Sequence, residues 1–316
     1  MIGRKLVDRL AADQGPGGRA ITALTLLDVV TSTAPSGFSG AVRTMETNLA
    51  DPGAAESAIA ARPDVIFHLA AVVSGEAETD FDKGYGVNLD GTRALFDAIR
   101  RIGVPYRPRV VFTSSIAAYG APFPDVIDDD FRTTPLTSYG TQKVINELLL
   151  ADYSRRGILD GIGLRLPNIC VRPGAPNKAA SGFFSSILRE PLAGLEAVLP
   201  VEDDVRTWHA SPAAAVGFLV HAASIDLTPL GGRRSLMMPG VSASVAEEID
   251  ALRRAAGEAA VCLIRREPDA AMTAMFRTIP GRFDTRRAAE LGFRAETSFD
   301  EIVEAHIRDM RALDPG

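Results

Sequence analysis

The sequence contains little cysteine, tryptophan or histidine. Among 316 residues there are two cysteines, one tryptophan and four histidines. Cys170 and Cys262 have neither a CxxC nor a Cys/His ligand spacing, which argues against a disulfide framework and against a metal site. Both lie in apolar runs, which indicates small buried side chains. We therefore expect no metal, and the cysteine usage fits a reducing cytoplasm.

Long apolar stretches and basic clusters are also missing. No run approaches the roughly 20 residues that a membrane-spanning helix needs, and residues 1–6 resemble the start of a helix more than a signal peptide. The net charge is −6 and the pI about 5.4, whereas phosphate binding needs clustered Lys and Arg. The sequence therefore predicts a soluble cytoplasmic protein with no nucleic-acid or membrane partner.

What is present is an alternation of strand-like and helix-like segments. Short apolar runs at 21–28, 41–47, 65–70, 109–113 and 162–166 predict strands, and residues 87–102 and 139–153 have helical spacing. Continuous apolar strands separated by helices are typical of a parallel sheet that is covered on both faces. The sequence therefore predicts an α/β fold with a Rossmann-type, doubly wound parallel sheet.

The first residues lack a feature that this fold normally has. A dinucleotide-binding fold opens with a strand and a glycine-rich turn, but here the sequence begins in what reads as the following helix, with Gly3 as the last glycine of the turn. Asp28 ends the next strand, 25 positions later (28 − 3). A carboxylate there binds ribose hydroxyls and repels a 2′-phosphate, which favours NAD over NADP. We expect the sequence as written to bind NAD poorly. A misassigned start codon explains the missing strand and glycine-rich turn better than a truncated enzyme does.

Tyr139 and Lys143 are the strongest chemical signal. Four residues apart in a predicted helix, they share one face, and an ammonium beside a phenol lowers the phenol pKa from about 10. The pair is a candidate general base for an alcohol, although the pattern also occurs by chance. Ser115 lies 24 positions earlier (139 − 115), after an apolar strand, where its hydroxyl could hold a substrate oxygen. Ser114 beside it is a candidate helix cap.

Two further motifs follow predicted strands or begin helices. His68-Leu69-Ala70-Ala71 ends a strand, and its small residues would let a nucleotide lie against the edge of the sheet. We interpret His68 as structural. Asn88 begins an apolar helix, either as an N-cap or as a support for the Lys143 side of the site through backbone or water contacts.

With these residues in order, the sequence resembles the extended short-chain dehydrogenase/reductases, the relatives of NAD-dependent sugar epimerases and dehydratases. The matching segments also include VNLDGT at 87–92, VVFTSSIAAYG at 110–120, YGTQK at 139–143 and RLPNICVRPG at 165–174. The resemblance implies a catalytic Ser115, Tyr139 and Lys143. It implies cofactor contacts from Gly3, Asp28, Asn48, Leu49, Leu69, Ala70, Ala71, Ser74, Asn88, Tyr139, Lys143 and Pro167. Many relatives have Asp where Asn48 stands, and Asn keeps an acceptor for the adenine.

A narrower resemblance, carried by residues 72–85, 169–194 and 205–212, is to the D-erythronate dehydrogenases, which oxidise the 2-hydroxyl of D-erythronate with NAD. A hydroxy acid needs a cation for its carboxylate, and Arg172, Lys178 and Arg206 are candidates, each of which could instead be a surface charge. Ser74 and Asn168 could bind hydroxyls or the nicotinamide. The implied substrate contacts are Ser74, Ser115, Tyr139, Asn168, Arg172, Lys178 and Arg206.

The domain organisation follows from a change near residues 172–174, after which Gly, Pro and polar residues are more frequent. We predict an NAD-binding domain at 1–170, with 205–224 packing back onto it, and a smaller substrate-binding subdomain at 171–204 and 225–316. By analogy with relatives, the helices at 87–102 and 139–153 imply a homodimer. Two alternatives stay open: a nucleotide-sugar epimerase or dehydratase that holds NAD tightly, and an inactive binding paralogue.

Overall fold

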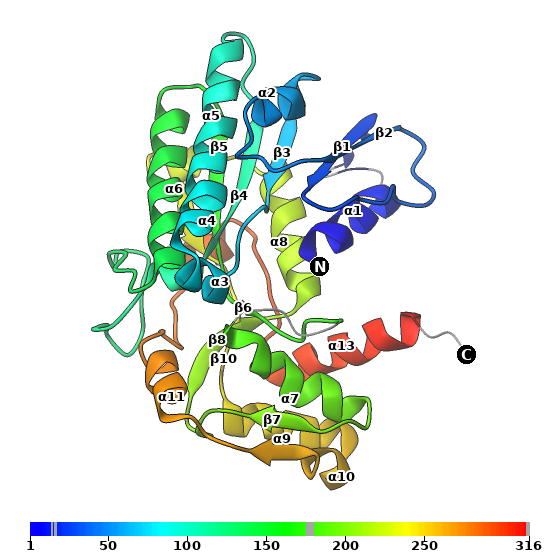
Figure 1. Ribbon diagram of the computed structural model, residues 1–316, viewed down its shortest axis with the longest axis vertical. Coiled ribbons are helices and arrows are strands. Elements are labelled where there is room, and N and C mark those ends of the chain that lie inside the picture. Colours follow the sequence, from blue (N-terminus) through cyan, green and yellow to red (C-terminus); the bar gives the residue numbers. More distant parts are fainter. Residues whose placement is uncertain (14, 16–17, 175–179, 314–316) are drawn as a thin grey trace.

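The computed structural model describes residues 1–13, 15, 18–174 and 180–313. Figure 1 shows two lobes, one built around strands β3, β4 and β5 and the other around helices α7, α9, α10 and α13. The chain passes between the lobes several times, near β6 and β8. No helix within these described ranges is long and apolar enough to cross a bilayer.

The first lobe is built on a four-stranded parallel sheet. Its order is β3 (Val65–His68), β4 (Arg109–Ser115), β5 (Asp160–Leu166) and β9 (Ser235–Met237). Side chains alternate between the faces of a strand, so Val110 and Phe112 pack toward α5 (Gly91–Ile102) and α6 (Ser138–Arg155), while Val111 packs toward α8 (Pro212–Ser224). The prediction of a parallel sheet with helices on both faces is confirmed.

Strands β1 (Ala23–Asp28) and β2 (Ala41–Glu46) form a separate parallel pair. Among the residues that the structure describes, no strand lies between β1 and β3. Residues of β1 and of β3 line the open space between them. The first helix, α1 (Ile2–Asp13), buries Leu6 and Leu10 against α8. Three short helices pack against α5 or α6 on the other face: α2 (Ala54–Ile59), α3 (Ser74–Thr79) and α4 (Phe81–Tyr85), followed by a π-helical turn at Gly86–Asp90.

The second lobe has its own apolar core, which includes Phe184, Ile187, Leu252 and Ile302. One small sheet joins β6 (Asn168–Ile169), β8 (Arg206–Ala210) and β10 (Val241–Ser244), and another pairs β7 (Ala197–Leu199) with β11 (Ile264–Arg266). The helices are α7 (Phe183–Leu192), α9 (Val245–Ala256), α10 (Glu258–Val261), α11 (Ala270–Phe276) and α13 (Phe299–Leu313), whereas α12 (Arg286–Glu290) packs against β9 of the first lobe. Short 3-10 turns lie at Ile116–Ala118, Ala180–Gly182 and Thr228–Leu230.

Two features differ from the sequence-based expectations. Strand β9 lies within the range 225–316 that was assigned to the second lobe, yet it pairs with β5 at the edge of the main sheet. Cys262 is exposed and not buried, because it follows α10 in a surface turn, whereas Cys170 is buried as expected.

Candidate active site

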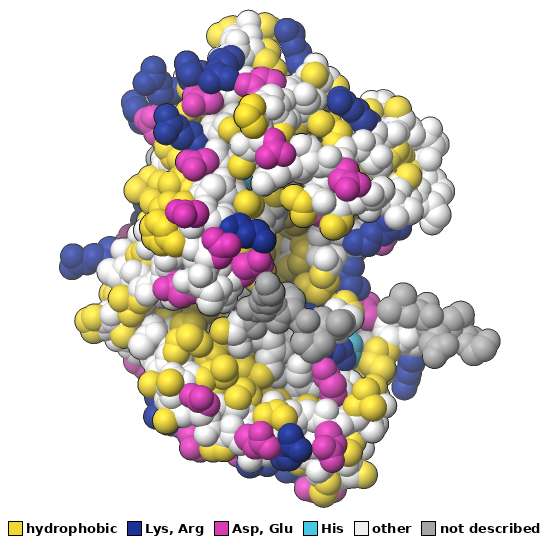
Figure 2. All heavy atoms as spheres, in the orientation of Figure 1, with side chains coloured by type: hydrophobic (Ala, Val, Ile, Leu, Met, Phe, Trp, Pro, Cys, Tyr) yellow, Lys and Arg dark blue, Asp and Glu magenta, His cyan; other side chains and the backbone are white. Residues whose placement is uncertain are grey.

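A cleft of about 2470 Å³ runs from the space beside β1 to the second lobe. Figure 2 shows it as the hollow between the two lobes. Most of the residues predicted to bind cofactor or substrate line it: Gly3, Asp28, Asn48, Leu49, Leu69, Ala70, Ala71, Ser74, Ser115, Tyr139, Lys143, Pro167, Asn168 and Arg172. Asn88 and Arg206 are not among the lining residues, and Lys178 lies outside the described residues.

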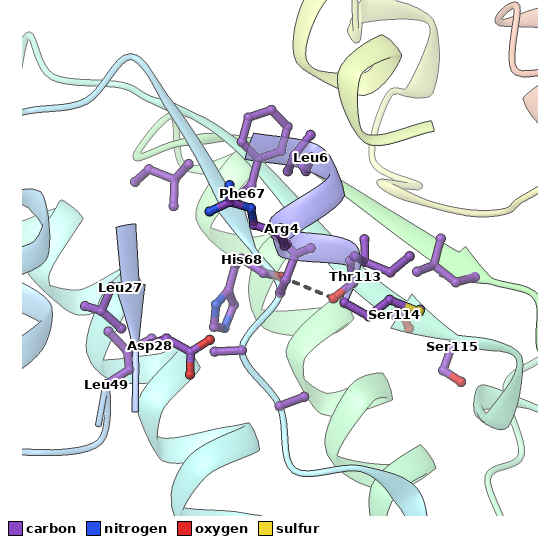
Figure 3. A pocket seen from close by; sticks show the side chains of 18 of the residues that line it. Arg4, Leu6, Leu27, Asp28, Leu49, Phe67, His68, Thr113, Ser114 and Ser115 are labelled. Carbon is purple, nitrogen blue, oxygen red and sulfur yellow. Dashed lines mark hydrogen bonds between the residues drawn. The ribbon is translucent and has the colours of Figure 1, made fainter. Parts of the chain in front are cut away.

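The parallel sheet explains why residues so far apart in sequence meet here. The carboxyl ends of parallel strands lie at the same edge of a sheet. Figure 3 shows Asp28 at the end of β1 and Ser115 at the end of β4 on opposite sides of the pocket, with His68 at the end of β3 between them.

Ser115 both ends β4 and begins the next turn. Its Oγ accepts a hydrogen bond from the backbone N–H of Ala117 at 3.1 Å, which leaves the hydroxyl proton free to be donated, and the hydroxyl hydrogen-bonds to Tyr139. The expectation that Ser114 caps this turn is wrong. Ser114 instead donates to Glu147, because its side chain points to the opposite face of the strand.

Tyr139 lies in the first turn of α6, whose N-terminus is capped by Thr137. Burial raises the pKa of Tyr139, and the hydrogen bond with Ser115 and the positive charge of Arg172 oppose that rise. Both opposing interactions stabilise the phenolate. A tyrosine placed in this way can exchange a proton with an alcohol in the cleft.

Lys143, one turn further along α6, is 2% exposed. Its Nζ donates to the backbone carbonyl of Thr113 at 2.8 Å and lies 5.5 Å from the centre of the Tyr139 ring. Burial lowers the pKa of Lys143 to about 8, against the raising effect of Glu147. The sequence predicted that Lys143 would lower the tyrosine pKa. In this structure the charge of Arg172 opposes the rise in the Tyr139 pKa, while the Lys143 ammonium donates to the Thr113 carbonyl.

A buried ion pair lies behind the catalytic residues, and sequence reasoning missed it. Glu147 Oε2 and Arg165 Nη2 are 2.6 Å apart, and both side chains are largely buried. Glu147 also accepts from Ser114, and Arg165 donates to the hydroxyl of Tyr119. The sequence could have indicated Glu147 as a neighbour of the site, since it follows Lys143 by four residues on the same helix face.

Asn88 supports the site from behind. Its side-chain oxygen accepts from the backbone N–H of Val72 at 2.7 Å, and its amide donates to Gln142 at 2.7 Å. It thereby joins the loop after β3 to α6 and does not itself line the cleft. His68 hydrogen-bonds to Thr92 at 2.8 Å, and burial lowers its pKa to about 3. Its ring is therefore neutral at physiological pH, in agreement with a structural role.

The first-lobe half of the cleft has several features that suit a dinucleotide. Asp28 presents an exposed carboxylate at the end of β1, which suits ribose hydroxyls. Ala70 and Ala71 leave room beside the sheet edge. Gly3 lies in the first turn of α1, and apart from its chain neighbours and the helix backbone no atom lies within 4 Å of the place where a side chain would begin. An open helix N-terminus of this kind suits a phosphate.

The second lobe contributes Asn168 and Arg172. The Nη2 atom of Arg172 donates to Asn168 Oδ1 at 3.0 Å and to Ser181 at 2.8 Å, and its Nε donates to the carbonyl of Ile169 at 2.9 Å. These bonds hold a guanidinium at the cleft beside Tyr139.

Arg206 is held elsewhere. Its Nη1 is 2.9 Å from Glu247 and 3.3 Å from the carbonyl of Ser242, so the structure does not bring it to the cleft. The second lobe supplies further lining residues that sequence reasoning missed, because no motif includes them: Ser181, Phe184, Thr207, Met275 and Ile279.

Comparison with known proteins agrees with this geometry. The NAD dependent epimerase/dehydratase family matches residues 1–218, about two thirds of the chain. A D-erythronate dehydrogenase from Cupriavidus necator is 48% identical over 291 residues, which cover 92% of this chain and 88% of that protein. A D-erythronate dehydrogenase from Haemophilus influenzae is 40% identical and covers 97% and 95% of the two chains.

A solved structure is also similar. The crystal structure of a protein described as the nucleoside-diphosphate-sugar epimerase from Agrobacterium tumefaciens superposes with a TM-score of 0.95 at 62% identity, over 98% of this chain and 92% of that one. The fold, the Ser-Tyr-Lys arrangement and these similarities agree. The chain belongs to the NAD dependent epimerase/dehydratase family, whose members use an NAD-type cofactor.

Proposed function

We propose that this protein oxidises the 2-hydroxyl of D-erythronate, or of a closely related aldonate, to the 2-oxo acid with NAD. One observation carries the proposal: the Arg172 guanidinium lies at the cleft close enough to Tyr139 for its charge to act on the phenol. In a 2-hydroxy acid the reacting carbon is bonded directly to the carboxylate. Its binding cation and its proton acceptor must therefore face the same part of one cleft, and both of these residues line it.

The residues divide the work as follows. Arg172 binds the carboxylate through a charge-assisted hydrogen bond. Ser115 donates a hydrogen bond to the substrate oxygen and keeps its own proton. Tyr139 accepts the proton of the 2-hydroxyl as that oxygen becomes a carbonyl. Bound NAD supplies the hydride acceptor. Lys143 carries a positive charge close to the tyrosine ring and would bind the ribose of the nicotinamide.

The choice of NAD over NADP is part of the proposal. Asp28 ends β1 with a carboxylate, and Val29, Val30 and Thr31 follow it, so no cation is next to it in sequence. A carboxylate accepts hydrogen bonds from the two ribose hydroxyls and repels the 2′-phosphate of NADP. Asn48 and Leu49 lie at the same side of the cleft and suit the adenine.

The experiment is to supply D-erythronate and NAD to the protein and to follow NADH. The Arg172→Met variant is expected to raise the KM for the acid by about 10- to 100-fold, since a hydrogen bond to a charged group contributes about 1.5–3 kcal/mol. Arg206→Met is the matched control and is expected to leave KM unchanged, because that guanidinium lies outside the cleft. If D-erythronate yields no NADH while another substrate is turned over, the assignment is wrong.

One observation favours a second function. The solved structure that is 62% identical is described as a nucleoside-diphosphate-sugar epimerase. An epimerase returns the hydride to its substrate and so keeps its NAD, whereas a dehydrogenase releases NADH at every turnover. Protein that purifies with non-exchanging NAD and shows no net NADH formation would favour the epimerase. Turnover of either kind would exclude an inactive binding paralogue.

A homodimer is the proposed assembly. Leu148 on α6 is 67% exposed and Phe81 at the start of α4 is 59% exposed, and Figure 2 shows hydrophobic side chains gathered over this side of the first lobe. A second copy packed on α5 and α6 would cover them. Light scattering is expected to give twice the chain mass for the native protein and a lower mass for Leu148→Glu.

A further inference from the structure

A chain of buried polar side chains runs from the cleft into the core of the second lobe. It begins at Arg172, continues through Asn168 on β6 and His209 on β8, and ends at Glu248 on α9. Asn168 and His209 are direct partners in the pairing of β6 with β8. His209 and Glu248 are both completely buried, with their side chains 0% exposed.

The distances define the links of this chain. Arg172 Nη2 donates to Asn168 Oδ1 at 3.0 Å, and Asn168 Nδ2 lies 3.4 Å from His209 Nδ1. His209 Nε2 is 3.0 Å from Glu248 Oε1, within ion-pair distance although not aligned for a hydrogen bond. The imidazole is held between two rings, since Phe184 and Phe299 each meet it edge to face at 5.3 and 5.2 Å.

Arginine fixes the direction of the two hydrogen-bonded links, from Arg172 to Asn168 and from Asn168 to His209. A guanidinium has donors only, so Asn168 must turn its oxygen toward Arg172 and its NH2 group toward His209. The Nδ1 atom of His209 must then accept, which puts the proton of a neutral imidazole on Nε2, facing the Glu248 carboxyl. The opposite tautomer would set the Nδ1 proton against the amide protons of Asn168, and the amide would have to flip and present donors to the guanidinium.

We propose that His209 and Glu248 are positioning residues that fix the orientation of the Asn168 amide and so hold Arg172 in place to receive the substrate carboxylate. The inference rests on the proposed function for the identity of that carboxylate. Buried ionisable groups are costly, and apolar residues of the same volume often stabilise a fold better. A role in the cleft gives a reason for such groups at 0% exposure.

Kinetics of matched variants test the proposal. His209→Gln removes the Nδ1 acceptor and is expected to raise the KM for the acid by about 3- to 10-fold, the effect of one hydrogen bond, with kcat changed less than twofold. His209→Asn restores an acceptor near the Nδ1 position, and its KM is expected to be closer to that of the native protein. His221→Gln is the control: that histidine bonds to the carbonyl of Leu291 at 2.8 Å, on α8 and away from the cleft.

The expected pattern is a raised KM in His209→Gln, partial recovery in His209→Asn, and no change in KM in His221→Gln. The proposal would be overturned if His209→Gln and His209→Asn lowered the melting temperature equally and did not show this KM pattern, because that result would indicate a purely structural role. If D-erythronate proves not to be the substrate, a second measurement still decides. Nitrogen NMR of the labelled native protein is expected to show His209 protonated at Nε2 and unprotonated at Nδ1, and a proton on Nδ1 would refute the directed chain.

Discussion

Lys143 should be needed for activity and costly for stability at the same time. Its side chain is 2% exposed, and burial lowers its pKa from 10.5 to about 8. At neutral pH that difference corresponds to about 3 kcal/mol of folding free energy, spent on keeping the ammonium charged inside the protein. Lys143→Met keeps the length of the side chain and removes the charge. It also loses the hydrogen bond to Thr113, which contributes about 1 kcal/mol.

The net expectation is a variant more stable by about 2 kcal/mol. For a chain of 316 residues, an unfolding entropy of about 2.1 cal/mol/K per residue converts this gain to a rise of about 3 °C in melting temperature. The assay is thermal unfolding without added NAD, together with the turnover rate, which is expected to fall by at least about a hundredfold. Arg308→Met changes an exposed cation that does not line the cleft and is expected to leave turnover unchanged and stability within about 0.5 kcal/mol.

The pH dependence gives the sharpest test. Below pH 8 both the folded and the unfolded protein carry the Lys143 proton, so the folded state bears the whole cost. Between pH 8 and 10.5 the folded protein loses the proton first, and the stability of the native protein rises relative to the variant. Above 10.5 neither state is charged and the difference is gone. A stabilisation by Met that stays constant from pH 7 to pH 10.5, or a variant less stable than the native protein at pH 7, would refute the reasoning.

Three further changes test other parts of the site. Tyr139→Phe removes the proton acceptor and is expected to lower kcat by about 10²- to 10⁴-fold with an unchanged melting temperature; turnover near the native rate would assign proton transfer to another group. Asp28→Ser is expected to weaken NAD binding by about tenfold or more. It is also expected to reduce the ratio of the affinity for NAD to the affinity for NADP, as measured by fluorescence titration of both nucleotides. Asn88→Ala leaves the backbone of Val72 without its buried partner and is expected to destabilise the fold by about 3 kcal/mol in urea unfolding; a loss below about 0.5 kcal/mol would show that water replaces the amide.

The sequence predicted the first lobe well because its information is local. Apolar runs of strand length and helices with an apolar face are set by neighbouring residues, and the runs at 65–70, 109–113 and 162–166 become β3, β4 and β5. The order of Ser115, Tyr139 and Lys143 was also readable, because strand ends gather at one edge of a parallel sheet. These positions follow from the chain order and from the handedness of the crossovers.

Only the tertiary structure decided which charges meet. Arg172 and Arg206 looked equivalent in sequence, but Arg172 lies at the cleft with Asn168, while Arg206 pairs with Glu247. Arg172 is also distant in sequence from Tyr139, and only the fold brings its charge close enough to oppose the rise in the Tyr139 pKa. Electrostatic interactions depend on distance and burial between residues far apart in the chain. The sequence thus determined the chemical groups of the site, and the packing of the second lobe against the first determined which of them act on one another.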